Sequence, residues 1–171
     1  MAETKKDNFT DHVISVRRVT KVTKGGKRFS FSALVVSGDK KGRVGIALGK
    51  SREVSSAIAK ATNKARRRLI EVPLRGDTIP YDVKGKHGAS KVVIRSASKG
   101  TGVIAGGAVR ALVEAVGIKD VLAKSLGSEN PQNVVKAALN AFAKLRTAKH
   151  LAKLRGKTVT ELVGGQKDAS A

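Results

Sequence analysis

The residues of this sequence with the most chemistry to offer are its cations. Lysine and arginine number 35 and aspartate and glutamate 13, which gives a formal net charge of +22. A compact chain with this charge repels itself unless a polyanion neutralises it. Nucleic acid is the expected partner because its backbone supplies closely spaced phosphates. An anionic membrane surface is the second possibility.

The expected phosphate contacts recur at organised corners of the chain: a strand-like segment, a two-glycine turn, a helix-like segment and a later turn. In chain order they are Arg17, Arg18, Lys21, Lys24, Gly25, Gly26, Lys27, Arg28, Lys50, Arg52, Lys60, Lys64, Arg67, Arg68, Lys84, Lys86 and His87. Aromatic residues make up only 3% of the chain. Recognition of phosphates and shape is therefore favoured over stacking on unpaired bases, and folded RNA fits best.

Residue types used for catalysis or metal binding show no useful pattern. The histidines His12, His87 and His150 share no ligand spacing, and cysteine is absent, which excludes disulfides, zinc ribbons and thiol catalysis. No serine lies in a nucleophile elbow, and the acidic residues are scattered. We therefore expect no enzyme, no cofactor and no metal site.

A glycine-rich segment at 99–107 invites a nucleotide-binding interpretation. Gly100, Gly102 and Gly106 read G-x-G-x-x-x-G, one residue too long for the dinucleotide fingerprint, and no G-K-[ST] follows. Two interpretations remain open. The segment is either a tight packing corner or a place where free backbone amides at a helix start meet an RNA phosphate.

The segment 27–31 (KRFSF) faintly resembles the RNP1 pattern of RNA-recognition modules, but Arg28 stands where that pattern has glycine. The alternation places Phe29 and Phe31 on the same side as Ala33 and Val35. Both phenylalanines are therefore expected in the core rather than on a stacking surface.

The segment 1–11 is expected to be a flexible arm and 12–74 the first folded unit. Alternating apolar and polar residues predict three antiparallel strands, and a helical periodicity follows over 54–69. Gly25-Gly26 is expected to form a type I′ turn with both residues at positive φ. A β-bulge at Arg17-Arg18 would restore the alternation, and Ser51 would cap the helix.

Residues 75–146 predict a second unit with a hairpin turning at 85–88, and a helix that follows the glycine-rich segment and ends at Gly117. A strand near 118–126 and a helix starting at Asn130-Pro131 complete it. Residues 147–171 are expected to form a basic tail, helical over 147–155 and disordered over 164–171. The predicted fold class is α+β: a β-β-β-α unit followed by a two-layer β-β-α-β-α unit.

Targeting signals are not apparent in the sequence. No run of about 18 apolar residues exists, and the first residues, MAETKKDN, are polar with mixed charge. We expect a cytoplasmic protein that does not enter membranes.

Three blocks carry a resemblance to a known family: KGGKRFSFSALVVSGDKKGRVG at 24–45, ASKGTGVIAGGAVRAL at 97–112 and VLAKSLGSENPQNVV at 121–135. Together, in this order, they resemble the bacterial-type small-subunit ribosomal protein S-five family. The resemblance implies a first unit similar to a double-stranded-RNA-binding domain that lacks its first helix.

The resemblance also implies function. It predicts a structural component of the small ribosomal subunit that binds and organises ribosomal RNA, contributes to decoding accuracy and lines the messenger RNA entry path. The surface of Gly102 and Arg110 would meet ribosomal protein S-four, and the C-terminal part S-eight; no homo-oligomer is expected. The alternatives are a free-standing RNA chaperone, which a repetitive or disordered chain would favour, and a nucleotide-dependent enzyme.

Overall fold

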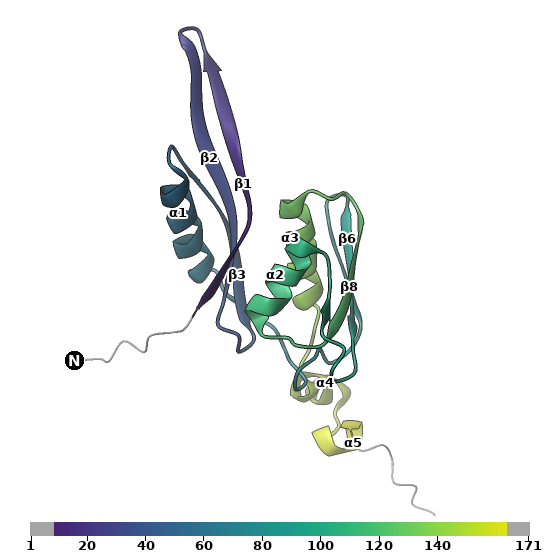
Figure 1. Ribbon diagram of the computed structural model, residues 1–171. Helices are drawn as coiled ribbons and strands as arrows, with labels where there is room; N and C mark the ends of the chain where they lie inside the picture. The colour runs from purple at the N-terminus through teal and green to yellow at the C-terminus, as the bar shows by residue number, and fades with distance from the viewer. Residues whose placement is uncertain (1–8, 164–171) are drawn as a thin grey trace, which may run out of the picture.

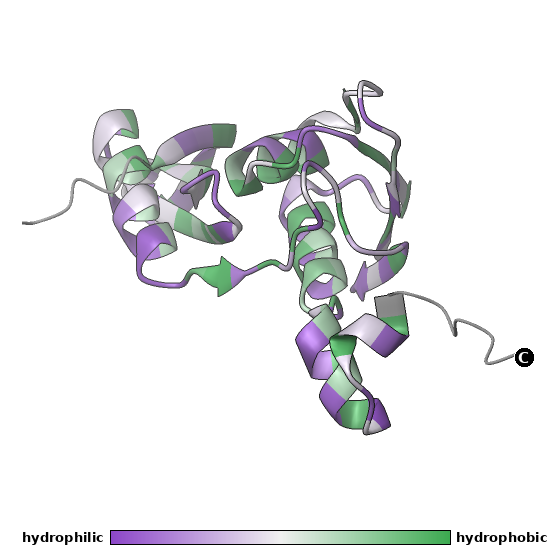
Figure 2. Cartoon of the chain, turned by 90° about the horizontal axis from the view of Figure 1, so that it is seen from below, coloured by the Kyte–Doolittle hydropathy of each residue, from purple (hydrophilic) through white to green (hydrophobic). Residues whose placement is uncertain are grey.

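The computed structural model describes residues 9–163, in two units that lie side by side (Figures 1 and 2). The predicted end at 164–171 and most of the predicted arm lie outside the described residues. The first unit contains β1 (Thr10–Thr23), β2 (Gly26–Gly38), β3 (Arg43–Ser51), α1 (Val54–Arg66) and β4 (Ile70–Glu71). Its strands form an antiparallel sheet in the order β1-β2-β3-β4.

The second unit contains β5 (Val83–His87), β6 (Ser90–Ser96), β7 (Val103–Ile104), α2 (Gly107–Val116), β8 (Val121–Gly127) and α3 (Pro131–Phe142). Its strand order is β5-β6-β8-β7, with β7 and β8 parallel. The tail helices α4 (Ala148–Arg155) and α5 (Val159–Val163) follow. The predicted α+β class is confirmed. Alternation did not reveal β4 and β7 because each is only two residues long.

The first sheet lies between two helices, α1 on one face and α2 of the second unit on the other (Figure 1). Ala33 and Val35 of β2 pack against alanines of α1. Leu34 and Val36, on the opposite face, join the core of the second unit. The inner part of β2, from Ala33 to Gly38, is therefore an uninterrupted buried run, as expected for a strand covered on both faces.

Helix α1 packs very close to the sheet. Its buried residues are Ala57, Ala61 and Ala65, all small. A Cβ added at Gly49 of β3 would overlap the carbonyl oxygen of Ala57, so only glycine permits this approach. The exposed side of the helix carries the cations Lys60, Lys64 and Arg66.

The turn between β2 and β3 joins the two units. The backbone amides of Lys40 and Gly42 donate to the carbonyl oxygens of Ala115 and Val116, at 3.1 and 3.0 Å, and so satisfy the C-terminal end of α2. Asp39 holds this turn together and is only 8% exposed. Its Oδ1 accepts from the amides of Lys41 and Arg43, and its Oδ2 accepts from Arg43 Nε at 2.7 Å.

Three local predictions were wrong. The register shift in β1 falls between Val13 and Ser15, not at Arg17-Arg18, so Ile14 is the extra residue. Ser51 ends β3, and Glu53 is the N-cap of α1 without a side-chain hydrogen bond. The β5–β6 turn lies at 88–89 rather than 85–88: Gly85 belongs to β5, where a Cβ would overlap the carbonyl oxygen of Ala137 in α3.

Candidate nucleic-acid interface

The outer half of the β1–β2 hairpin, residues 16–31, extends well beyond α1 (Figure 1). Six predicted contacts lie on it and all are exposed: Arg17, Arg18, Lys21, Lys24, Lys27 and Arg28. Lys21 is directly opposite Arg28 in the strand pair. Like charges so placed destabilise a hairpin, and a bound polyanion relieves that repulsion.

The tip of the hairpin differs from the predicted turn. Thr23 pairs with Gly26, so the turn residues are Lys24 and Gly25. Positive φ occurs at Gly26, at 137°, and not at Gly25 or Lys24, so the predicted type I′ turn is wrong. Thr23 Oγ1 donates to the carbonyl oxygen of Gly26 at 3.0 Å and closes the tip.

Phe29 does not lie in the core, contrary to the sequence prediction. It is 48% exposed, and the guanidinium of Arg18 lies 4.9 Å from its ring centroid. Phe31, two residues nearer the base, is half-buried and packs beside Ala33 and Val35. The physical reason is that α1 does not extend along the whole hairpin. Phe31 is opposite Ser51, the last residue of β3 before the chain turns into α1, so Phe29 lies beyond the region that α1 covers.

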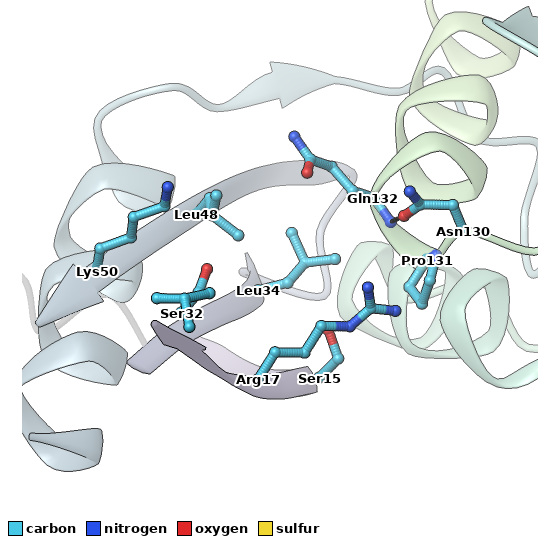
Figure 3. A pocket seen from close by; sticks show the side chains of 10 residues that line it. Ser15, Arg17, Ser32, Leu34, Leu48, Lys50, Asn130, Pro131 and Gln132 are labelled. Carbon is cyan, nitrogen blue, oxygen red and sulfur yellow. Dashed lines mark hydrogen bonds between the residues drawn. The ribbon is translucent and has the colours of Figure 1, made fainter. Parts of the chain in front are cut away.

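Four predicted cations meet at one cleft between the two units. Arg17 of β1 and Lys50 of β3 line one part of it, and Lys64 and Arg68 line the adjoining part. Figure 3 shows Arg17 and Lys50 on the sheet, with Asn130, Pro131 and Gln132 of the second unit opposite.

The remaining predicted contacts of the first unit do not line this cleft. Arg52 is exposed between β3 and α1, and Arg67 is the exposed C-cap of that helix. Lys60 Nζ lies 3.4 Å from Ser51 Oγ.

Sequence reasoning missed the contribution of the second unit to this cleft. Gln132 and Lys136 of α3 line it together with Leu34 and Leu48. No linear pattern connects α3 with β1–β3; only the shared core, which fixes the two units together, brings them near one another.

Lys84, Lys86 and His87 lie apart from this cleft, on β5 of the second sheet. Lys86 is opposite Lys91 of β6, which repeats the like-charge pairing of the hairpin. Lys84 and Lys86 lie on one face of the strand and His87 on the other, and none of the three lines the cleft.

The glycine-rich segment is fastened from inside the protein. Asp120 is 5% exposed, and its Oδ1 accepts from the amides of Gly100 and Gly102 at 3.0 and 2.9 Å. These two amides are already satisfied by a carboxylate, which favours the packing-corner interpretation over phosphate binding at them.

Arg110 lies on the exposed side of α2. Its Nε donates to Glu114 Oε1 at 2.8 Å, and both side chains are substantially exposed, as the spacing of four residues predicts. Among residues 9–163, no cluster of histidine or acidic side chains could hold a metal ion. No helix in the same range is long and apolar enough to cross a membrane.

Two small α+β units carry cations without carboxylate partners, among residues 9–163, on a projecting hairpin and in a cleft, which is the pattern of an RNA-binding protein. Comparison with known proteins identifies the family. Residues 9–73 match the ribosomal protein S5 N-terminal domain and residues 85–155 the ribosomal protein S5 C-terminal domain. The chain belongs to the ribosomal protein S5 family, and is therefore a structural, RNA-binding protein of translation rather than an enzyme.

Relatives with the name small ribosomal subunit protein uS5 align over most of both chains. That of Pelagibacter ubique is 50% identical over 160 residues, covering 93% of this chain and 94% of the relative. The Syntrophobacter fumaroxidans protein is 56% identical over 152 residues, covering 89% and 92%. The Gluconobacter oxydans protein is 52% identical over 159 residues, covering 92% and 83%.

Proposed function

We propose that the chain binds and organises the RNA of the small ribosomal subunit, with the outer half of the hairpin as its principal contact. As a family member it resides in the small ribosomal subunit in the cytoplasm. The observation that carries the proposal is the six exposed cations on the hairpin. Within the described residues, none of the six forms an ion pair with a carboxylate. A narrow, convex strand pair of this kind fits between the phosphates of folded RNA.

Charge reversal at the tip tests this proposal. The Lys24→Glu/Lys27→Glu variant should fold normally because both side chains are exposed. It should incorporate poorly into small subunits and bind a ribosomal RNA fragment with a salt slope flatter by about 0.7–0.9 per lost phosphate contact. Lys91→Glu/Lys124→Glu, at exposed positions of β6 and β8 outside the proposed contacts, makes the same change in net charge and serves as the control. Equal incorporation of both variants would contradict the proposal.

The finer roles that we propose concern mainly the second unit. We propose that the surface of Gly102 and Arg110 contacts ribosomal protein S-four and thereby contributes to decoding accuracy. The C-terminal part would contact S-eight, and the basic surface would help to line the messenger RNA entry path. Support comes from the exposure of Arg110, whose side chain has Glu114 as its one partner among residues 9–163.

The Arg110→Ala variant tests the S-four contact. The exposed pair is worth only a few tenths of a kcal/mol, so the fold should be almost unchanged. Misreading by ribosomes that carry the variant should rise, as measured with a near-cognate reporter. Lys153→Ala, a charge removal in the tail, should leave accuracy unchanged. Normal accuracy in Arg110→Ala would rule out this role.

A further inference from the structure

The cleft between the first sheet and α3 has a composition unlike that of the hairpin tip. Two adjoining cavities of about 230 and 300 Å³ form it and share Leu34, Leu48 and Gln132. Together they have a size typical of small-ligand sites. Its floor is the face of the sheet opposite α1, and its wall is the start of α3 (Figure 3).

Strand register arranges the floor in two rows. Ser15, Leu34 and Leu48 are cross-strand neighbours and give a mainly apolar row. Arg17, Ser32 and Lys50 give the next row, with a hydroxyl between two cations. An apolar surface thus lies directly beside a positively charged one.

The β-bulge at Ile14 produces this arrangement. Without the extra residue, Val16 would lie opposite Ser32, and Arg17 would lie opposite Phe31 on the face that α1 covers. The bulge therefore aims the guanidinium of Arg17 into the cleft, which is a common use of bulges.

The wall supplies amides and another cation. Asn130 Oδ1 accepts from the Gln132 backbone amide at 3.2 Å, so the helix end is already capped. In residues 9–163, the Gln132 side-chain amide and Nδ2 of Asn130 donate to no other protein group. Lys136 follows one turn later, and no carboxylate lines either cavity.

We propose that this cleft binds an unpaired RNA segment, an inference that rests on the proposed function and specifies a second mode of contact. Phosphates would lie on Arg17 and Lys50 at one end and near Lys136 at the other. A base would cover Leu34 and Leu48, with its edge toward the Gln132 amide. A duplex does not fit this mode of contact because both faces of each of its bases are stacked on neighbouring bases, so none is free to cover Leu34 and Leu48.

The test compares two RNAs and two variants of the full chain. Lys50→Glu/Lys136→Glu changes the cleft, and Lys24→Glu/Lys27→Glu makes the same charge change at the hairpin. A labelled unpaired 10-nucleotide RNA should bind the cleft variant at least about tenfold more weakly than wild type, with duplex affinity nearly unchanged. The hairpin variant should show the opposite pattern.

Equal losses of affinity for both RNAs in both variants would mean that the lysines attract RNA only through nonspecific charge. That result would overturn the inference and leave the proposed function in place. Loss of affinity in neither variant would overturn the proposed function itself.

A second measurement compares two RNAs of equal charge on the wild-type protein. Wild-type protein should bind the unpaired RNA about fivefold more tightly than an abasic strand with the same number of phosphates. Gln132→Leu, which alters only the wall of the cleft, should reduce this preference. Equal affinity of wild type for the two strands would overturn the inference.

Discussion

The inner and outer halves of the β1–β2 hairpin are one continuous strand pair with opposite roles. In the inner half, β2 from Ala33 to Val36 is at most 3% exposed, enclosed by α1 and the core of the second unit. Beyond the Arg18–Phe31 pair, toward the tip, no helix within residues 9–163 covers either face, and Val22 is 70% exposed. Isolated hairpins are marginal in water, so the outer half depends on the inner half for its order.

The difference shows that the inner half contributes mainly to stability and the outer half mainly to binding. In the inner half, Gly38 tolerates no added Cβ because it lies against the backbone of Ala115. The outer half carries charges that contribute little to folding and are therefore available for phosphates. Substitutions in the two halves should consequently have very different costs, and the following predictions test this contrast.

Gly38→Ala should have the largest effect. A Cβ at this position would overlap the carbonyl oxygen of Ala115, where the β2–β3 turn meets α2. We expect a loss of about 3 kcal/mol in the free energy of unfolding, typical of severe overpacking. Urea denaturation measures it. A loss below that of Gly26→Ala would break the contrast between the halves.

Asp39→Asn should have the next largest effect. Burial by itself raises the pKa of the Asp39 carboxyl, but hydrogen bonds from Arg43 and from the amides of Lys41 and Arg43 outweigh it and hold the pKa below its ordinary value of 3.8. Loss of the charged hydrogen bond to Arg43 should cost about 1.5 kcal/mol at neutral pH.

The lowered pKa of Asp39 also predicts how the stability difference between wild type and Asp39→Asn depends on pH. A carboxyl whose folded pKa is lowered stabilises the fold above its unfolded pKa and loses that contribution as pH falls through the folded value. The stability difference between wild type and Asp39→Asn should be constant near neutral pH and shrink below pH 3.8. Denaturation at a series of pH values measures it, and a difference that grows on acidification would contradict the assignment.

The tip glycines should give the smallest effects, and unequal ones. Gly26 has φ of 137°, so Gly26→Ala should cost about 1 kcal/mol. Gly25 has neither positive φ nor a neighbour within 4 Å of an added Cβ, so Gly25→Ala should change stability by only a few tenths of a kcal/mol. Equal costs would favour the type I′ turn expected from the sequence.

Periodic and capping signals made much of the fold predictable. Val135, Ala138, Leu139 and Phe142 are all buried on α3, as their helical spacing predicted. The Asn130-Pro131 start of α3 and the left-handed Gly117 that ends α2 were likewise predicted from local chemistry.

The features that sequence did not predict depend on what covers each segment. The bulge lies at Ile14, which packs against the shared core of the two units. The alternation of apolar and polar residues does not show which part of β1 contacts that core. Phe29 is exposed because α1 begins too late to reach it. The cleft requires residues from both units, and no spacing rule relates Lys50 to Gln132.

The hydrogen bonds between the β2–β3 turn and α2 also have a mechanical consequence. The 13 residues of β2 span about 43 Å, so the first unit, clamped at this contact and along the shared core, carries the hairpin tip as a long arm. A rotation of about 5° at the clamp would carry the tip through about 4 Å, roughly the spacing between neighbouring strands. The reach of Lys24 and Lys27 is therefore set at the far end of the arm, by Gly38 and by the backbone amides of Lys40 and Gly42.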